Sequence, residues 1–359
     1  MRIAFLIPGL KGGGAERFTV NITNTLCENP NNEIYLITGE RKTGEYKTKK
    51  KIHRVILLSG SLIRDLCRVR HYLKVNSIDV CVGIDIYANL ILSINNINLM
   101  TTTVLSERTA PNHMPYSRLV KFLRKIFFCR ADYYVFQTND ARSFYSRSIQ
   151  QRSIVIPNPV KEGLPKRIEP IKKEVVAVGR LDKVKNYELL LRAFKDIHKR
   201  YPDYKLRIFG DGNQKKHLVE LSKNLAIDKN VVFEGFSSNV HNQIAHSDIF
   251  VMTSDLEGMP NSLIEAMTMG FPVISTDCPV GAPREMIGEN ENGLLIPIGD
   301  KCSLVRSINQ LISDRELNRT LGKKAEKKSR EYSIDIIKSK WEDVLSKMIS
   351  KEYKGMTRL

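Results

Sequence analysis

The sequence predicts an α/β protein with two Rossmann-like domains, each built on a parallel sheet with helices on both faces. Its 359 residues, 42% of them hydrophobic, exceed what one ordinary domain needs. Short β-type runs alternate with helical stretches along the whole chain, as in strand, crossover helix, strand units. The alternation pauses at a Pro- and Lys-rich stretch, residues 161–173, and then restarts. That stretch is expected to link the domains.

The first domain is expected over residues 1–160. Apolar side chains recur at helical spacing over residues 15–27 and 62–75, between runs rich in Val, Ile, Tyr and Phe. The expected strands of this domain are Ile3–Ile7, Glu33–Thr38, Val55–Leu58, Val80–Val82, Thr103–Leu105, Tyr133–Phe136 and Ile154–Ile156.

The second domain is expected over residues 174–333. A last amphipathic helix, about 334–350, contains the only tryptophan, Trp341, and can pack back on the first domain. The expected strands of the second domain are Val175–Val178, Lys205–Phe209, Val231–Phe233, Asp248–Thr253, Pro272–Ser275 and Leu294–Ile296.

Charge is concentrated in the first half of the chain. The net charge is +18, and residues 1–170 carry a surplus of 13 positive charges. Such a half can attract nucleic acid, anionic lipid or a polyphosphate substrate. No helix-turn-helix, zinc or aromatic RNA-binding signature accompanies the charge, so nucleic acid is not the expected partner.

The cysteines and the apolar runs indicate a cytoplasmic protein. Six cysteines are scattered without a C-x-x-C pair, so we expect buried thiols in a reducing compartment and neither a disulfide framework nor a zinc site. The apolar run after Met1 is too short for a signal peptide, and no apolar span has membrane length.

The most informative segment is Glu257–Glu265. A turn follows a buried strand, and Pro260 stands where a first helical turn tolerates proline. Glu257 would precede the helix, and Glu265 could accept hydrogen bonds from the vicinal hydroxyls of a ribose. The competing interpretation is a pair of solvated helix-capping acids. Unpaired amides that could receive a diphosphate are expected at Asn261, Ser262 and Leu263.

Other loops after strands carry candidate ligand contacts, because ligands of such sheets bind beyond the carboxyl ends of the strands. Gly13 and Gly14 permit close backbone approach but lack G-x-G-x-x-G spacing, so a flexible turn competes. Arg180 and Lys185 could clamp a pyrophosphate, or be ordinary surface charge. Gly210 belongs to a Phe-Gly-Asp-Gly turn that could approach a nucleotide.

A basic amphipathic helix is predicted after residue 116. Apolar side chains recur here at helical spacing, which suits a helix in a membrane interface. These side chains are Leu119, Phe122, Leu123, Ile126 and Phe127. A core-facing helix with a solvated basic face is the competing interpretation. The flanks carry Arg118, Lys121, Arg124 and Lys125.

Taken in order, these motifs resemble the retaining glycosyltransferases of family 4, which have the GT-B fold. The resemblance spans nearly the whole chain and implies two Rossmann-like domains whose parallel sheets face a central cleft. The matching segments are Gly-Gly-Gly-Ala-Glu-Arg (12–17), Val-Gly-Arg-Leu-Asp-x-x-Lys-Asn (178–186), Phe-Gly-Asp-Gly (209–212), Glu-Gly-Met-Pro-Asn-Ser-Leu-Ile-Glu-Ala-Met (257–267) and Gly-x-Pro-Val-Ile-Ser-Thr (270–276).

The resemblance implies a nucleotide-sugar donor, with UDP the most frequent carrier in the family. Arg180 and Lys185 would contact the diphosphate, Glu257 the sugar and Glu265 the ribose, while Gly13 and Gly14 would close over the donor. The family commonly has a histidine in the loop after residues 103–106, and here the sequence is Ser-Glu-Arg-Thr. Either Arg108 takes a related polar role or His113 substitutes.

The resemblance also bears on mechanism and acceptor. No D-x-D triplet occurs, so no metal or other cofactor is expected, and retention implies attack from the leaving-group face. The loop that contains Glu16 and the Ser-Glu-Arg segment resemble enzymes that extend lipid-diphosphate-linked sugars. The expected acceptor is therefore a polyprenyl-diphosphate-linked saccharide at the anionic inner face of the plasma membrane. The alternatives are a nonhydrolysing nucleotide-sugar epimerase and a basic nucleic-acid-binding protein.

Overall fold

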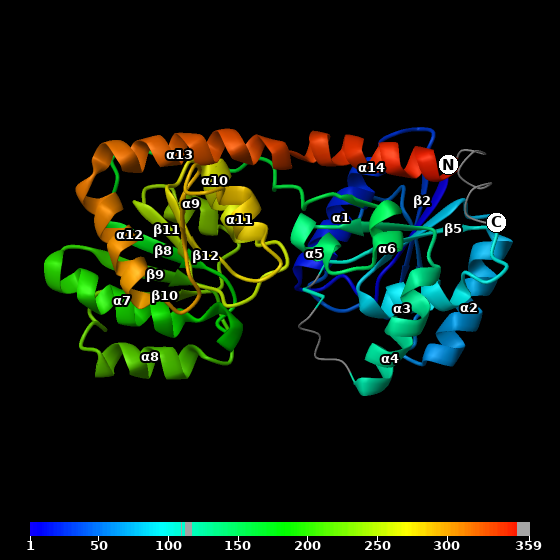
Figure 1. The fold of residues 1–359 in the computed structure, drawn as a ribbon, viewed down its shortest axis with the longest axis horizontal. Helices are drawn as coiled ribbons and strands as arrows, with labels where there is room; N and C mark the ends of the chain where they lie inside the picture. The colour runs from blue at the N-terminus through cyan, green and yellow to red at the C-terminus, as the bar shows by residue number, and fades with distance from the viewer. Residues whose placement is uncertain (109, 112–116, 350–359) are drawn as a thin grey trace. The chain divides into compact units, whose positions relative to one another are not determined.

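The chain folds into two α/β units, each with one parallel sheet (Figure 1). The structure is a computed structural model and describes residues 1–108, 110–111 and 117–349. Unit 1 comprises Met1–Pro159 together with Ile334–Leu359, and unit 2 comprises Val160–Ser333. The chain passes between the units twice, and the Val160 amide donates a hydrogen bond of 2.7 Å to the Tyr332 carbonyl beside both passages.

Unit 1 has a seven-stranded sheet in the order β3-β2-β1-β4-β5-β6-β7. Every neighbouring pair is parallel. The order reverses between β1 and β4, as in a doubly wound sheet. The strands are β1 (Arg2–Leu6), β2 (Glu33–Thr38), β3 (His53–Ile56), β4 (Val80–Ile84), β5 (Thr102–Ser106), β6 (Tyr133–Phe136) and β7 (Ser153–Val155).

The last helix of the chain completes the core of unit 1. Trp341 is fully buried, and its ring centroid lies 6.3 Å from that of Phe5 and 5.8 Å from that of Phe18. A strand of the sheet and the first helix therefore both pack on it. The helices of this unit are α1 (Gly14–Leu26), α2 (Leu62–Val75), α3 (Ile86–Asn95), α4 (Arg118–Phe127), α5 (Asn139–Ser143), α6 (Arg147–Gln151) and α14 (Ile334–Ile349).

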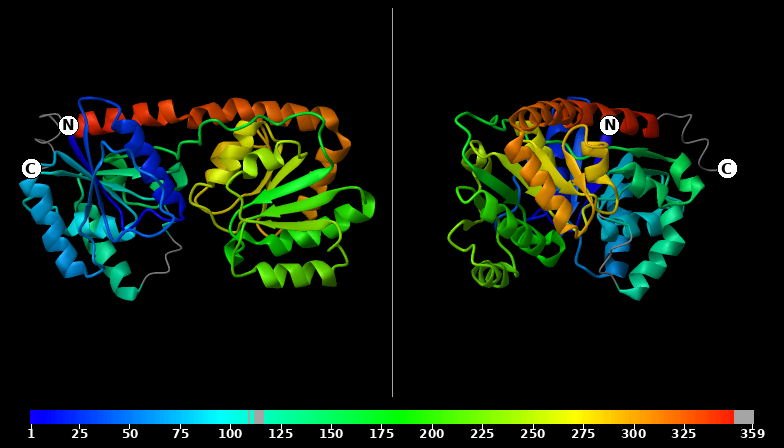
Figure 2. Two further views of the ribbon diagram at one scale, coloured as in Figure 1. Left: turned by 180° about the vertical axis from the view of Figure 1, so that it is seen from behind. Right: turned by 60° about the vertical axis from the view of Figure 1, so that its left-hand side comes forward.

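Unit 2 has a six-stranded parallel sheet in the order β10-β9-β8-β11-β12-β13, seen obliquely in Figure 2. Strands β11 and β12 are wholly buried because helices cover both faces, which is why they appear in the sequence as continuous apolar runs, whereas the edge strand β10 is partly exposed. The strands are β8 (Glu174–Val178), β9 (Lys205–Phe209), β10 (Val231–Gly235), β11 (Ile249–Met252), β12 (Val273–Thr276) and β13 (Leu294–Ile296).

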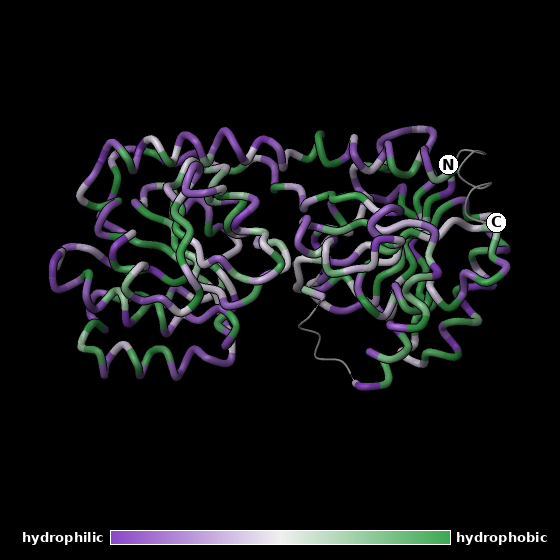
Figure 3. Tube along the Cα trace, viewed as in Figure 1, coloured by the Kyte–Doolittle hydropathy of each residue, from purple (hydrophilic) through white to green (hydrophobic). Residues whose placement is uncertain are grey.

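Two apolar cores lie on the two faces of the second sheet. One joins β8, β9 and β11 to α7, α8 and α12, and the other joins the same strands to α9, α10 and α11. In Figure 3 the strands are mostly hydrophobic and α13 is mainly hydrophilic. The helices are α7 (Tyr187–Arg200), α8 (Lys215–Asn224), α9 (Val240–Ile244), α10 (Asn261–Met269), α11 (Ala282–Ile287), α12 (Lys301–Ser313) and α13 (Arg315–Ser329).

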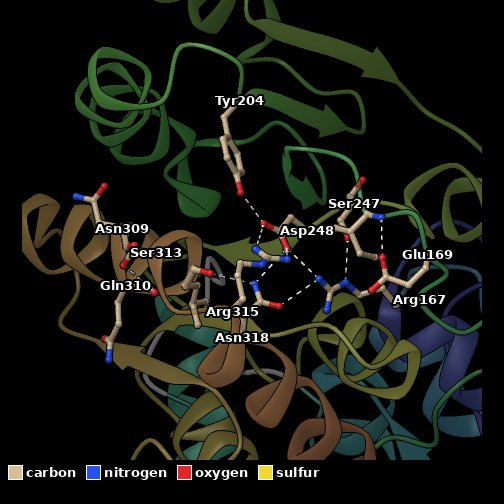
Figure 4. Close-up of polar contacts among 12 residues, drawn as sticks. Arg167, Glu169, Tyr204, Ser247, Asp248, Asn309, Gln310, Ser313, Arg315 and Asn318 are labelled. Atoms are coloured by element: carbon tan, nitrogen blue, oxygen red, sulfur yellow. Dashed lines mark hydrogen bonds and ion pairs between the residues drawn. The ribbon is translucent and has the colours of Figure 1, made fainter.

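A buried polar network lies at the amino end of β11 (Figure 4). Asp248 is 1% exposed and accepts two hydrogen bonds from Arg315, at 2.7 and 2.9 Å. It also accepts from Arg167 at 2.9 Å, Tyr204 at 2.7 Å and Asn318 at 3.1 Å. With several donors per carboxylate, the burial of this charge is compensated.

All thirteen expected strands are present, with ends within two residues of the predicted ones. The expected linker, residues 161–173, differs from the prediction because it is part of unit 2. The Arg167 amide donates to the Met269 carbonyl at 2.7 Å, and the Arg167 side chain enters the Asp248 network. The boundary therefore falls after Pro159.

Among the described residues, no helix combines the length and apolarity that crossing a bilayer requires.

The expectation of six buried thiols is wrong for half of them, because Cys67, Cys129 and Cys302 are exposed. Cys27, Cys81 and Cys278 are buried.

Candidate functional site

The candidate residues of unit 2 lie at the carboxyl edge of its sheet, in the loops after the strands and in helix α10. They follow β8, β9 and β11, and β8 and β11 are the central neighbours from which the chain continues in opposite directions. Such a reversal leaves a crevice beyond the strand ends, where ligands bind in open α/β sheets.

Lys185 and Glu257, 72 positions apart in sequence, meet at this edge as an ion pair. The Ser254 hydroxyl donates to the same carboxylate oxygen, Oε1, at 2.7 Å. Arg180 lies differently, because its side chain is 80% exposed and pairs with Asp182 of its own loop at 3.2 Å. In this structure Lys185 is thus fixed beside Glu257, and Arg180 extends into solvent.

Polar contacts within the loop and to the loop after β11 fix the segment that carries Lys185. The Lys185 amide donates to the Asp182 carboxylate at 3.3 Å, and its carbonyl accepts from the Thr253 hydroxyl at 3.0 Å. Asn186, at a φ of +46°, donates to the Asp255 carboxylate at 2.8 Å. The loops after β8 and β11 are consequently joined before any ligand binds.

Gly210 allows two loops of unit 2 to touch. Its φ is +134°, and a Cβ there would overlap the carbonyl oxygen of Gly179. A Cβ at Gly212 would overlap the Leu181 carbonyl in the same way. The close backbone approach expected of Gly210 is therefore made to the neighbouring loop of the protein itself.

Helix α10 begins one residue later than expected. Pro260 is the N-cap rather than a residue of the first turn, and the Leu263 amide donates to the Pro260 carbonyl at 3.1 Å. The expectation that Leu263 offers an unpaired amide is therefore wrong. Asn261 and Ser262 are the first two helical residues, at the positive end of the helix dipole.

Glu265 is 7% exposed and has a partner that the sequence analysis missed. His241 Nε2 lies 2.9 Å from Glu265 Oε2. Because an ionised carboxylate only accepts hydrogen bonds, the histidine is the donor. Both Glu257 and Glu265 are thus largely buried and paired, so the interpretation of solvated capping acids is wrong.

Two buried groups beside Glu257 were also missed. Burial, with a smaller contribution from the Glu257 charge, raises the pKa of the Cys278 thiol to about 12. The same two causes raise the pKa of the Tyr187 hydroxyl well above its ordinary value. Both side chains are therefore neutral near pH 7.

In unit 1, the Arg108 side chain is buried, at 7% exposure. It donates to the Ser106 hydroxyl at 2.8 Å and to the Ile156 carbonyl at 3.1 Å, and its guanidinium lies 3.6 Å from the centre of the Phe18 ring. Burial lowers the pKa of Arg108 to about 9. These contacts hold the Arg108 side chain in place, and its polar role near the sugar stays a prediction. His113, the alternative, lies outside the described residues.

The glycine loop of unit 1 leads directly into α1. Gly13 is the N-cap and Gly14 the first helical residue. A Cβ at Gly13 would overlap the Glu16 carboxylate, so Glu16 folds back over the loop. Glycine at position 13 is what permits this contact.

Helix α4 exposes part of its apolar face. Leu119 is 64% exposed, Phe122 59% and Ile126 42%, whereas Leu123 and Phe127 are half-buried and no residue of the helix is fully buried. The core-facing interpretation therefore does not hold for Leu119, Phe122 and Ile126. Arg124 departs from the expected basic surface because it donates to both Glu107 oxygens, at 2.7 and 2.9 Å. The exposed basic residues are Arg118, Lys121 and Lys125.

Comparison with known proteins places the chain in a family. Residues 165–328 match the family described as Glycosyl transferases group 1. An uncharacterised glycosyltransferase of Haemophilus influenzae is 27% identical over 354 residues, which cover 96% of this chain and 99% of that one. A Campylobacter jejuni α-1,4-N-acetyl-D-galactosaminyltransferase, named for an undecaprenol-diphosphate-linked substrate, is 26% identical over 355 residues, 95% and 97% of the two chains.

A solved structure, Anabaena HepE in complex with UDP, has the same fold. It is 18% identical and superposes with a TM-score of 0.80 over 97% of this chain and 100% of its own. Both units of this chain have the parallel α/β architecture of such proteins. The chain therefore belongs to the group 1 glycosyltransferases and has the GT-B fold.

Proposed function

We propose that this glycosyltransferase moves a hexose or N-acetylhexosamine from a UDP-sugar to a polyprenyl-diphosphate-linked saccharide, with retention, in bacterial polysaccharide or glycan assembly. The observation that carries the proposal is the half-buried Lys185–Glu257 pair just before α10, with the buried Glu265 on that helix. A cation, a helix N-terminus and two carboxylates match the diphosphate, sugar and ribose of a nucleotide sugar.

In this proposal Lys185 and the first amides of α10 bind the diphosphate. An ammonium group has three donors, so Lys185 can contact Glu257 and a phosphate oxygen at the same time. As the bond between the anomeric carbon and the phosphate oxygen breaks, its electron pair stays on that oxygen. Lys185 and the helix dipole stabilise the developing charge. The acceptor hydroxyl attacks the same face and passes its proton to the departing phosphate oxygen, so that the configuration is retained. Glu257 binds the transferred sugar.

The named substrates of relatives support the donor and acceptor classes. HepE binds UDP, and the Campylobacter jejuni relative is named for a substrate on undecaprenol diphosphate. The exposed apolar and basic residues of α4 suit an anionic membrane surface, where such an acceptor resides. We therefore propose a peripheral location on the inner face of the plasma membrane.

A panel of nucleotide sugars tested by thermal shift examines the donor assignment. A ligand that binds only the native state raises the apparent melting temperature by mass action, so UDP-sugars are expected to raise it. No shift with any UDP-sugar would contradict the proposal. Interconversion of UDP-sugars without an acceptor would instead identify an epimerase.

The proposed reaction needs no metal, because Lys185 and the α10 terminus take the charge of the diphosphate. Transfer measured in excess EDTA is expected to match transfer without it. Loss of activity in EDTA with recovery on adding manganese would show that this part of the proposal is wrong.

A further inference from the structure

We propose that His241 is a positioning residue that sets the Glu265 carboxylate for the nucleotide ribose, and that the enzyme's preference for ribonucleotides over deoxyribonucleotides depends on it. The inference rests on the proposed function, which assigns Glu265 to the ribose. It adds to that function the residue that prepares Glu265 for its ligand.

The His241–Glu265 contact is short and largely excluded from water. The two atoms, Nε2 and Oε2, are 2.9 Å apart, and the side chains are 13% and 9% exposed. Water competes little for a hydrogen bond at this depth, and one that involves a charged group is stronger than a neutral one. The contact therefore constrains the carboxylate.

Both ends of the contact are fixed by packing. His241 lies on α9 between Val240 and Ile244, which are 9% and 2% exposed and belong to the core that α9 shares with α10. Glu265 is flanked on α10 by Ile264 and Ala266, each 1% exposed. Neither backbone can shift without disturbing that core.

A fixed carboxylate plane matters for binding a diol. The last torsion of a glutamate side chain is broad, so an unconstrained carboxylate rotates readily. Two vicinal hydroxyls can donate to one carboxylate only in a narrow range of orientations. His241, by bonding Oε2 from one side, selects the orientation of Glu265 before the nucleotide arrives, which is preorganisation of the binding site.

The experiment measures binding of UDP, 2′-deoxy-UDP and 3′-deoxy-UDP to the full chain by calorimetry. His241→Phe keeps a ring but removes the donor, and His241→Gln keeps a donor at a similar reach. Because the Glu265 carboxylate is no longer held in one orientation, UDP binding is expected to weaken about tenfold in His241→Phe. Binding of the deoxy analogues should hardly change, and His241→Gln should recover most of the preference for UDP.

The outcomes distinguish a failure of this inference from a failure of the proposed function. Glu265→Gln should abolish the preference for UDP. If it does so while His241→Phe retains the preference, or weakens all three nucleotides equally, the inference is overturned and the function stands. If the unaltered chain does not bind UDP, or Glu265→Gln keeps the preference, the proposed function itself fails.

Folding of the variants is checked by circular dichroism. Should His241→Phe not fold, His241→Asn replaces it, because its amide is too short to reach Oε2 from the same backbone position. The comparison of Gln with Asn then decides between the outcomes: a preference kept by Gln and lost by Asn supports the inference, and equal behaviour overturns it.

Discussion

Glu257 and Glu265 stand on the same segment but have different partners. Lys185 and Ser254 contact Glu257, whereas His241 contacts Glu265. The first carboxylate lies beside the cation proposed to bind the diphosphate, and the second lies further along α10. Their substitution should therefore affect different kinetic parameters.

Glu265→Ala is expected to weaken nucleotide binding by at least about tenfold, since a charged hydrogen bond is lost, with a smaller effect on turnover. Glu257→Ala should mainly lower kcat. Steady-state kinetics and calorimetry with UDP measure both quantities. Glu220→Ala, an exposed carboxylate on α8, serves as the control and should resemble the unaltered enzyme. Equal losses of binding and turnover in the two variants would contradict the division of roles.

Of the charged residues of unit 2, Asp248 is expected to contribute most to stability. Asp248→Asn leaves Arg167 and Arg315 without their shared carboxylate, and breaking a buried pair costs about 3 kcal/mol or more. Urea denaturation followed by circular dichroism should show the loss.

The matched control is Asp203→Asn. Asp203 is 74% exposed and pairs only on the surface with Lys173, at 3.2 Å, so its change should cost under about 1 kcal/mol. Comparable losses in the two variants would show that the Asp248 network adds nothing beyond an ordinary surface pair.

The sequence predicts the positions of some of these site residues but not of others. Lys185 and Glu257 follow neighbouring parallel strands, so the topology alone predicts that they meet. His241 lies 24 positions before Glu265 on a helix of five residues, too short to give a periodic signal. Arg124 looked like one of four equivalent basic residues, because no pattern reveals that it pairs with Glu107.

Among the helices and strands, α4 differs most clearly between what its sequence pattern predicts and where its side chains lie. Its apolar spacing predicts a helix, but a period of 3.6 residues does not say whether the apolar face meets a core or a membrane. In the structure Leu119, Phe122 and Ile126 are exposed, whereas Leu123 and Phe127 of the same helix are half-buried. Only part of the apolar face is therefore turned away from the core of unit 1.

Reversing the charges of Arg118, Lys121 and Lys125 to Glu is expected to lower binding to anionic liposomes. Each basic residue near such a surface contributes about 1 kcal/mol. Donor binding, measured by thermal shift, should be unchanged. The control reverses Lys216, Lys223 and Lys229, exposed residues of unit 2, and so changes the net charge equally. Unaltered flotation of the α4 variant would refute membrane contact through this helix.

At the scale of the whole molecule, the alternation of strands and helices determined the architecture, and the two parallel sheets followed from it. The spacing of the cysteines in the sequence did not predict which thiols are buried. Cys67 and Cys302 lie on amphipathic helices, α2 and α12, where their position around the helix decides their exposure.

The six thiols should divide equally by reactivity. Cys67, Cys129 and Cys302 are expected to react rapidly with Ellman's reagent at pH 8, and the three buried thiols only in urea. Burial raises the pKa of Cys278 to about 12, so its reactive thiolate is scarce at that pH. Absorbance of the released thiolate, native against unfolded, counts them. Four or more rapid thiols in the native protein would contradict the burial described.

The contact of Trp341 with Phe5 and Phe18 has a consequence for biosynthesis. A ribosome makes residues 1–159 before unit 2, but the helix that covers α1 and its side of the sheet, residues 334–349, is made after unit 2. Unit 2 is one continuous stretch and can close its core as soon as it emerges. The usual order, in which the N-terminal domain finishes first, is therefore reversed here: the unit that begins the chain is the last to be completed.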